Sequence, residues 1–310
     1  MSCIGGRSPG DGSAPGTARR EQITNKCLPT IQMKKEHLYI ALLISGFIGL
    51  LWIAIPIKEI LNQYFSDELI NKLNAGIITR FFILLILIGI VKKFKFENFN
   101  GVGKVKSVAN IHALILPCGF IAIGIMSNWS NYIDAGLILF LLFTTSVFLV
   151  GFVEEFAFRG IILPLFIQSF FKKRYVLYIS IVATSLAFGA IHFINFFRQP
   201  DNLPGIIRQM FFALSIGVFF GGLLLRTESI IVVSFFHGLV NFAFGADEIN
   251  RDIQKEIVEK SNDAINWSSV IPTTLFFAFI LFGGLYMIRK VDREAVLRKL
   301  EPLTKDTGEA

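Results

Sequence analysis

DAGLILFLLFTTSVFLVGFVEEFAFRGIILPLFIQSFF, residues 134–171, is a long apolar stretch broken by only four charged side chains. An apolar run of about 18 or more residues is long enough to cross a bilayer core of roughly 30 Å. Lipid leaves only helices and closed barrels as spanning structures, and barrel strands alternate apolar with polar residues. This stretch is continuously apolar, so it predicts transmembrane helix.

The rest of the chain repeats this pattern. Its 310 residues are 53% hydrophobic, with a mean hydropathy of +0.61, whereas soluble domains are about 45–50% apolar. We therefore predict an all-α, polytopic bundle of about eight transmembrane helices with both termini cytoplasmic. The spans are expected near 38–57, 77–91, 108–126, 134–156, 176–197, 206–225, 229–246 and 270–288.

The basic residues indicate the orientation, because cytoplasmic loops carry an excess of Lys and Arg. Alternate loops are basic, beginning with the N-terminal segment and ending with the C-terminal tail. The segment 247–263 is acidic on balance and falls on the outer side. The net charge of +7 is thus explained by topology and anionic lipid, and we expect no nucleic-acid partner. The three cysteines form no Cys-x-x-Cys pair, which argues against a disulfide framework or a cysteine metal site.

Composition divides the chain into five segments. We expect a disordered leader (1–33), accessory transmembrane helices (34–133), a catalytic core (134–246), an external loop (247–269), and a last helix with a cytoplasmic tail (270–310). The leader is rich in Gly, Ser, Pro and Arg and lacks the apolar centre of a signal peptide.

Ionisable residues within spans are costly and commonly functional. Glu154 and Glu155 lie between apolar runs, with Arg159 one turn later. On a helix Glu155 and Arg159 are i,i+4 neighbours and can pair. Glu154 points about 100° away, which leaves it free to act as a general base. A charge cluster at the end of a span is the structural alternative.

Two further groups lie in later spans. Phe188 precedes His192 by one helical turn, and His237 precedes Asn241 by the same spacing, which places each pair on one helix face. Hydrogen bonding between helices is the structural alternative for His237 and Asn241. Taken together, a Glu, two His and an Asn from three helices can activate water or hold a metal with an open position.

The ordered set Glu154-Glu155-x-x-x-Arg159, Phe188-x-x-x-His192 and His237-x-x-x-Asn241 resembles the three motifs of the CPBP family (CAAX protease and bacteriocin-processing, or Abi) of intramembrane proteases. The resemblance covers roughly residues 134–245. It implies an intramembrane peptidase.

The resemblance also implies a role for each motif residue. Glu154 and His192 activate a water, while His237 and Asn241 stabilise the developing oxyanion. Glu155 and Arg159 shape and neutralise the site. Descriptions of the family as metal-dependent leave a second possibility, in which Glu154, His192 and His237 bind a divalent metal such as zinc. The sequence leaves metal-free and metal-bound water both open.

The depth of Glu154 raises a difficulty. A span ending near residue 156 places Glu154 at the cytoplasmic surface, whereas His192 lies roughly 24 Å into an oppositely directed helix. We therefore predict a longer tilted helix or a break near Gly160 and Pro164, which moves Glu154 towards the middle of the membrane.

The function predicted is hydrolysis of a peptide bond in a membrane-associated protein or peptide, by an integral protein of a bacterial cell membrane. If the resemblance extends to the prenyl-protein branch, the enzyme removes three C-terminal residues; bacterial peptide maturation is the other option. A transporter that relays protons through the Glu and His residues and a catalytically silent scaffold are the alternatives from other classes.

Overall fold

The computed structural model describes residues 28–102, 109–197, 200–250 and 267–300. Of the predicted segments, the leader up to residue 27, the external loop over 251–266 and the tail from 301 lie outside these residues. Within them all regular structure is helical, which confirms the all-α class. The elements are α2 (Leu28–Trp52), α3 (Ala54–Tyr64), α4 (Glu68–Lys93), α5 (Glu97–Asn100), η1 (Ile111–Leu114), α6 (Ile115–Ser127), α7 (Trp129–Asp134), α8 (Leu137–Ala157), η2 (Phe158–Ile162), α9 (Leu163–Ser169), α10 (Val176–Ile191), η3 (His192–Phe197), η4 (Pro200–Asn202), α11 (Leu203–Thr227), α12 (Ile230–Phe244), η5 (Ala246–Ile249), α14 (Trp267–Ile288) and α15 (Arg293–Arg298).

In this part of the chain, six helical segments are long and apolar enough to cross a membrane. They are Lys35–Tyr64, Glu68–Lys93, Leu137–Ser169, Val176–Phe197, Pro200–Thr227 and Val270–Ile288. The windows predicted near 108–126 and 229–246 fall on two shorter apolar helices, Ile111–Ser127 and Ile230–Phe244. The polytopic bundle is therefore confirmed, with two of its eight apolar helices shorter than a full span.

The outer faces of the bundle are apolar. Phe82, Leu85 and Phe282 are among many large hydrophobic side chains that are more than half exposed. A soluble monomer rarely exposes apolar patches of this extent, whereas contact with lipid tails explains them. The molecule is thus an integral membrane protein by the character of its surface as well as by the length of its helices.

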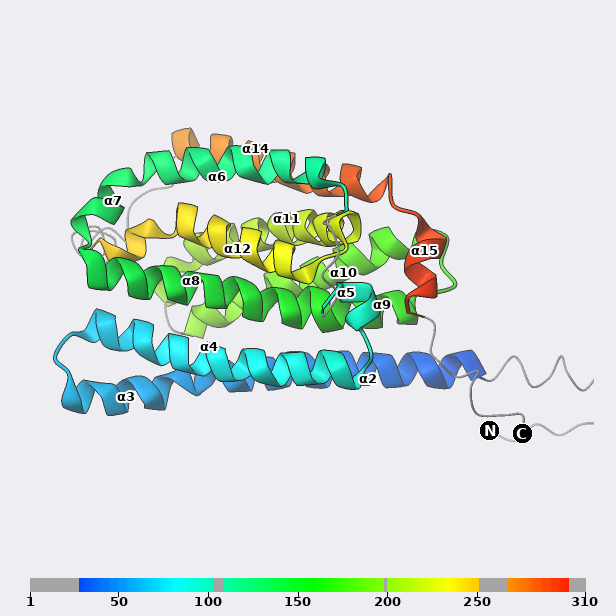
Figure 1. The fold of residues 1–310 in the computed structure, drawn as a ribbon, viewed down its shortest axis with the longest axis horizontal. Coiled ribbons are helices and arrows are strands. Elements are labelled where there is room, and N and C mark those ends of the chain that lie inside the picture. Colours follow the sequence, from blue (N-terminus) through cyan, green and yellow to red (C-terminus); the bar gives the residue numbers. More distant parts are fainter. Residues whose placement is uncertain (1–27, 103–108, 198–199, 251–266, 301–310) are drawn as a thin grey trace, which may run out of the picture.

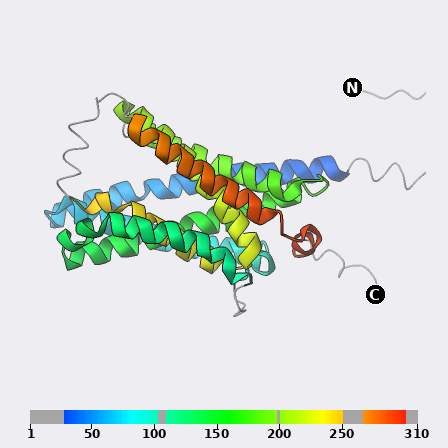
Figure 2. The ribbon, with the colours of Figure 1, turned by 90° about the horizontal axis from the view of Figure 1, so that it is seen from above.

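Figure 1 shows α2, α3 and α4 on one side of the bundle, α8 and α12 in the middle, and α6 and α14 on the other side. α11 is the most buried of the six spans and packs against α10, α12 and α14. In the view from above, α14 runs along the bundle towards α15 (Figure 2). The core is largely aromatic and aliphatic, with Phe219, Phe220 and Leu223 of α11 fully buried.

The span predicted near 134–156 is longer than expected. α8, the π-helical turn η2 and α9 form one continuous helical segment of 33 residues. A π turn shifts the backbone hydrogen bonds by one residue, and the side chain of Asn100 donates to the Gly160 carbonyl at 2.9 Å. Pro164 lies in the first turn of α9, where its missing N–H costs little. The break predicted near Gly160 is thus a π turn that continues the helix.

Side-chain contacts gather several helix ends at one end of the molecule. His37 contacts Ser169 at 2.8 Å, and Gln168 donates to the carbonyl of Leu300 at 3.2 Å. Arg226 donates to the carbonyl of Lys290 at 3.2 Å. The start of the first span, the end of α9 and the segment leading into α15 therefore share one end. This agrees with an even number of crossings, and cytoplasmic termini remain our prediction.

The opposite end is fixed by a polar cap between α7 and the end of α12. Tyr132 donates to the carbonyl of Phe242 at 2.7 Å, Asn128 donates to that of Ala243 at 3.0 Å, and Asn131 donates to Asp247 at 3.0 Å. Burial, assisted by the negative charge of Asp247, raises the pKa of Tyr132 to about 12. Its hydroxyl therefore stays protonated and keeps the end of α12 in place.

Candidate active site

The site is built where α8 crosses α12, and two glycines allow the approach. A Cβ on Gly151 would lie 2.5 Å from the backbone nitrogen of Gly238. A Cβ on Gly238 would lie 2.7 Å from Cδ1 of Phe148. No real Cβ is accommodated at such distances, so both positions require glycine for this packing. The contact brings Glu154 and Glu155, one turn beyond Gly151, up to His237, the neighbour of Gly238.

Four ionisable side chains form a connected chain at this crossing. Nη1 of Arg159 lies 3.0 Å from Oε1 of Glu155, and Nδ1 of His237 lies 2.7 Å from the same oxygen. Nε2 of His237 faces Oε2 of Glu154 at 3.4 Å. The predicted pair between Glu155 and Arg159 is confirmed, and Glu154 is left outside that pair, as the helix spacing predicted.

Burial separates the roles of the two carboxylates. The side chains of Glu155 and Arg159 are 0% and 1% exposed, whereas that of Glu154 is 22% exposed. A buried charge is tolerated when it is paired, and Glu155 faces both Arg159 and His237. Glu154 is therefore the more exposed carboxylate of this cluster.

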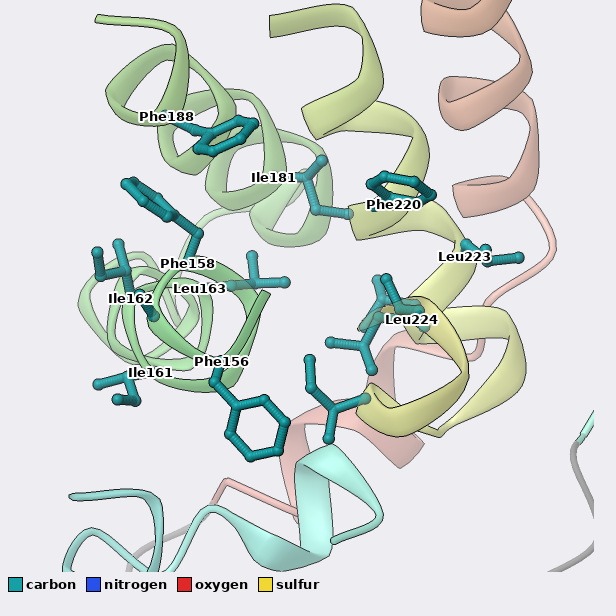
Figure 3. Packing of buried hydrophobic residues seen from close by; sticks show 14 of the residues in the cluster. Phe156, Phe158, Ile161, Ile162, Leu163, Ile181, Phe188, Phe220, Leu223 and Leu224 are labelled. Carbon is teal, nitrogen blue, oxygen red and sulfur yellow. The ribbon is translucent and has the colours of Figure 1, made fainter. Parts of the chain in front are cut away.

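Arg159 occupies a tight pocket between α10 and α11. Its Cζ lies 4.7 Å from the centre of the Phe188 ring, a cation–π contact. Its Nη2 would be 3.0 Å from a Cβ on Gly217. Figure 3 shows the rings of Phe188 and Phe158 close together across α10 and η2, with centroids 4.9 Å apart. This aromatic wall fixes the guanidinium and, through it, Glu155.

Phe188 also separates the two histidines. Nδ1 of His192 lies 2.8 Å from the carbonyl of Phe188. The Phe188 ring meets His192 edge-on at 5.0 Å and His237 at 6.1 Å. A carbonyl or carboxylate can only accept, so each histidine donates from Nδ1. Both therefore present Nε2 to their surroundings, and Phe188, a residue of the second motif, lies between them.

The continuous helix Leu137–Ser169 resolves the mismatch in depth that the sequence suggested between Glu154 and His192. Glu154 is about 22 Å from the Ser169 end of its span, and His192 is about 24 Å from the start of α10, at 1.5 Å per residue. The two motifs therefore lie at matching depths. Within the described residues no hydrogen bond or ion pair joins His192 to Glu154, and Phe188 links α10 to the cluster through its ring contacts with His192 and His237.

Asn241 lies one turn beyond His237 on α12 and is half-buried. Its backbone carbonyl accepts from Gly245 at 2.9 Å. In the described part of the chain no side-chain hydrogen bond joins it to the four-residue cluster. The structure thus brings together Glu154, Glu155, Arg159 and His237, places His192 beside them through Phe188, and leaves Asn241 one turn away.

A further charged residue, Arg80 of α4, was absent from the sequence-based set. Its Nη1 donates to Oγ of Ser146 on α8 at 3.1 Å. The Arg80 guanidinium also interacts electrostatically with the Glu154 carboxylate. Arg80 is the only charged residue in the window 77–91. A lone arginine inside a predicted span was the signal that could have revealed it.

The donor set at this crossing does not match the needs of a metal. Among the described residues no group of three or more His, Cys, Asp or Glu side chains is arranged to hold a metal ion. The conditional ligands Glu154, His192 and His237 do not form such a group, since the Phe188 ring lies between the histidines. A three-ligand zinc site therefore does not fit this arrangement, and we derive no step through a metal.

Residues 136–243 match the model of a protein family described as type II CAAX prenyl endopeptidase Rce1-like. The match begins at α8 and ends within α12, so it contains every motif residue of the candidate site. It confirms the resemblance of this segment to the CPBP family, whose Rce1-like members are intramembrane peptidases. Neither the curated proteins nor the solved structures compared with the chain gave a match.

Proposed function

We propose that this protein is an intramembrane endopeptidase that hydrolyses a peptide bond of a membrane-associated protein or peptide. One observation carries the proposal. The chain Arg159–Glu155–His237–Glu154 lies at the α8–α12 crossing, inside the segment that matches the Rce1-like family. Burying a connected set of charged groups within a membrane protein costs free energy, and a role in hydrolysis explains why these groups are present.

In this proposal Glu154 and His192 take a proton from water. Glu154 supplies a partly exposed carboxylate, and His192, whose Nδ1 is fixed by the Phe188 carbonyl, supplies the lone pair of Nε2. The resulting hydroxide attacks the carbonyl carbon of the substrate and forms a tetrahedral oxyanion. Return of the proton to the amide nitrogen then allows the C–N bond to break.

His237 and Asn241 stabilise the oxyanion. Because Nδ1 of His237 donates to Glu155, donation from Nε2 requires the doubly protonated imidazolium. Glu154 and Glu155 both face the His237 ring, and Arg159 balances the charge of Glu155. Asn241 contributes an amide N–H once substrate fills the space between the helices. Each donor of this kind is expected to contribute about 10²–10³ in rate.

The finer parts of the proposal concern substrate and location. The family match favours a substrate cleaved three residues from its C-terminus. The scissile amide must be extended or locally unwound, since a helix buries its amides in its own hydrogen bonds. A bacterial membrane as the site of action stays a prediction from the sequence.

The test is cleavage of a membrane-tethered reporter peptide by purified protein in liposomes. Glu154→Gln is expected to lower the rate by about 10²–10⁴, the contribution of a general base. Glu59→Gln makes the same change on the exposed face of α3 and should leave the rate unchanged. Equal cleavage by the wild type and Glu154→Gln would refute the proposal. Glu154-dependent proton flux without cleavage would support a transporter instead.

A further inference from the structure

Several polar atoms are buried around the ion pair of Arg159 and Glu155 without a hydrogen bond to the described part of the chain. They include Nη2 of Arg159, Oε2 of Glu155 and Oγ of Ser185 on α10. All three residues are at most 1% exposed. Nearly all buried polar atoms in folded proteins are hydrogen-bonded to protein or to ordered water. This group of atoms therefore indicates a ligand that the proposed mechanism does not use.

Gly217 of α11 shows how close two of these atoms are. A Cβ on Gly217 would lie 2.9 Å from Oγ of Ser185 and 3.0 Å from Nη2 of Arg159. Two atoms that are both about 3 Å from one point are at most about 6 Å apart. They form no direct hydrogen bond. A water that bonds to two atoms at about 2.8–3.0 Å each can bridge such a separation.

The charges at this position favour a neutral ligand over an anion. Nη1 of Arg159 is 3.0 Å from Oε1 of Glu155, so the guanidinium is already balanced by a carboxylate. A chloride ion would leave a net negative charge among fully buried groups, which is costly. Water can accept from Nη2 of Arg159 and donate to Oγ of Ser185. Buried waters typically make about three hydrogen bonds, and Oε2 of Glu155 is a further buried acceptor.

We propose that one water molecule is bound beside Gly217, where it accepts a hydrogen bond from Nη2 of Arg159 and donates one to Oγ of Ser185. Ser185 is in this account a positioning residue. Through the water it holds the guanidinium of Arg159, which contacts the same Glu155 oxygen that Nδ1 of His237 contacts at 2.7 Å. The effect on rate rests on the proposed endopeptidase function, whereas the water site stands without it.

The first test is a crystal structure of the full chain at a resolution that shows ordered water. We expect one water within about 3.2 Å of both Nη2 of Arg159 and Oγ of Ser185. A direct hydrogen bond between the two side chains would overturn the inference. Crystals soaked in bromide, which is located by its anomalous scattering, test for an anion. Bromide at this position would also overturn the inference.

The second test is the stability of Ser185→Ala in mixed micelles, measured by denaturant titration. Removing a buried hydroxyl that has no partner is neutral or stabilising, whereas removing one that is joined to a charged group is destabilising. Ser185→Ala should therefore unfold at a lower denaturant concentration than the wild type. An equal or higher concentration would overturn the inference. Ser180→Ala is the matched control, because Ser180 is a fully buried serine of the same helix about 140° further round, and it should not be destabilised.

The third test is cleavage of the tethered reporter peptide in liposomes. Ser185→Ala should lower kcat on the order of tenfold, as expected for coupling within one hydrogen-bond network. KM should stay within about twofold, because Ser185 is buried and acts through Arg159. Ser180→Ala should keep the wild-type kcat, and an unchanged kcat in Ser185→Ala would overturn the positioning role. If the wild type does not cleave the reporter, the endopeptidase proposal fails, while the crystal structure and the unfolding measurement still decide the water site.

Discussion

Two helix crossings in this molecule use glycine in the same way but differ in what surrounds them. Where α11 crosses α14, a Cβ on Gly284 would lie 2.6 Å from Cα of Phe219, and one on Gly222 would lie 2.6 Å from the Gly284 carbonyl. Where α8 crosses α12, Gly151 and Gly238 make an equally close approach. The first crossing is lined by apolar side chains, and the second encloses Glu154, Glu155, Arg159 and His237.

The difference teaches that close packing here does not require charge. Small residues alone let membrane helices approach and pack, as at α11–α14. Replacing a buried ion pair by apolar side chains is often neutral or stabilising. The charges at α8–α12 are therefore kept for a reason other than stability, and the proposed hydrolysis supplies that reason.

The largest expected effect on stability comes from leaving one buried charge alone. Glu155→Ala removes the partner of Arg159 and of Nδ1 of His237. We expect a loss of about 3–5 kcal/mol in the free energy of unfolding, the usual result of breaking a buried pair. Denaturant titration in mixed micelles measures it. The double variant Glu155→Leu/Arg159→Met should recover most of that stability yet remain inactive, and recovered cleavage would contradict the role given to Glu155.

The next effect compares the crossings directly. Gly151→Ala and Gly284→Ala each add one methyl group where no space exists, so both should lose about 1–3 kcal/mol of unfolding free energy. Only Gly151→Ala should lower kcat per folded molecule, because it moves Glu154 away from His237. Reporter cleavage normalised to folded protein makes the comparison. Equal losses of kcat in both variants would show that the site does not depend on the α8–α12 approach.

A smaller effect is expected at the π turn. Asn100→Ala removes the donor to the Gly160 carbonyl and leaves that buried acceptor unpaired, which costs about 1–3 kcal/mol. Thermal unfolding should place Asn100→Ala below wild type. An unchanged unfolding temperature would mean that the π turn needs no side-chain donor.

The smallest effect concerns the surface. Lys299 contacts Glu228 at 2.8 Å with both side chains partly exposed. Lys299→Met should change the free energy of unfolding by about 0–1 kcal/mol, because exposed ion pairs contribute little. Cleavage should be unchanged. A marked loss of activity in this variant would show that α15 communicates with the site, which the present account does not include.

Much of this architecture follows from sequence pattern. The apolar runs predicted the helices, and the spacing of Glu155 and Arg159 predicted their pair, because both follow from local geometry. The length of the α8–α9 span could not be predicted in the same way, since Arg159 and Pro164 resemble the end of a span. The burial of Arg159 against Phe188 and the hydrogen bond that Asn100 donates to the Gly160 carbonyl both depend on residues distant in the chain.

Two features of the site, the Glu155–His237 contact and the position of Arg80, could not be predicted from the sequence for the same physical reason. The hydrogen bond from Nδ1 of His237 to Glu155 depends on the crossing of α8 and α12, and the two residues are 82 positions apart in the chain. Arg80 depends on α4 packing against α8. Such contacts are set by tertiary packing, which the motif spacing alone does not specify. The side chain of Asn241 remains the motif member whose predicted role has the least support from contacts.

The most direct test of the central claim is to replace Glu154 by leucine and measure stability and cleavage on the same preparation. If the charge serves chemistry, Glu154→Leu should unfold at the same or a higher denaturant concentration than the wild type, and its cleavage of the reporter should be abolished. A variant that loses stability and retains cleavage would contradict the account, because the carboxylate would then belong to the packing of the bundle.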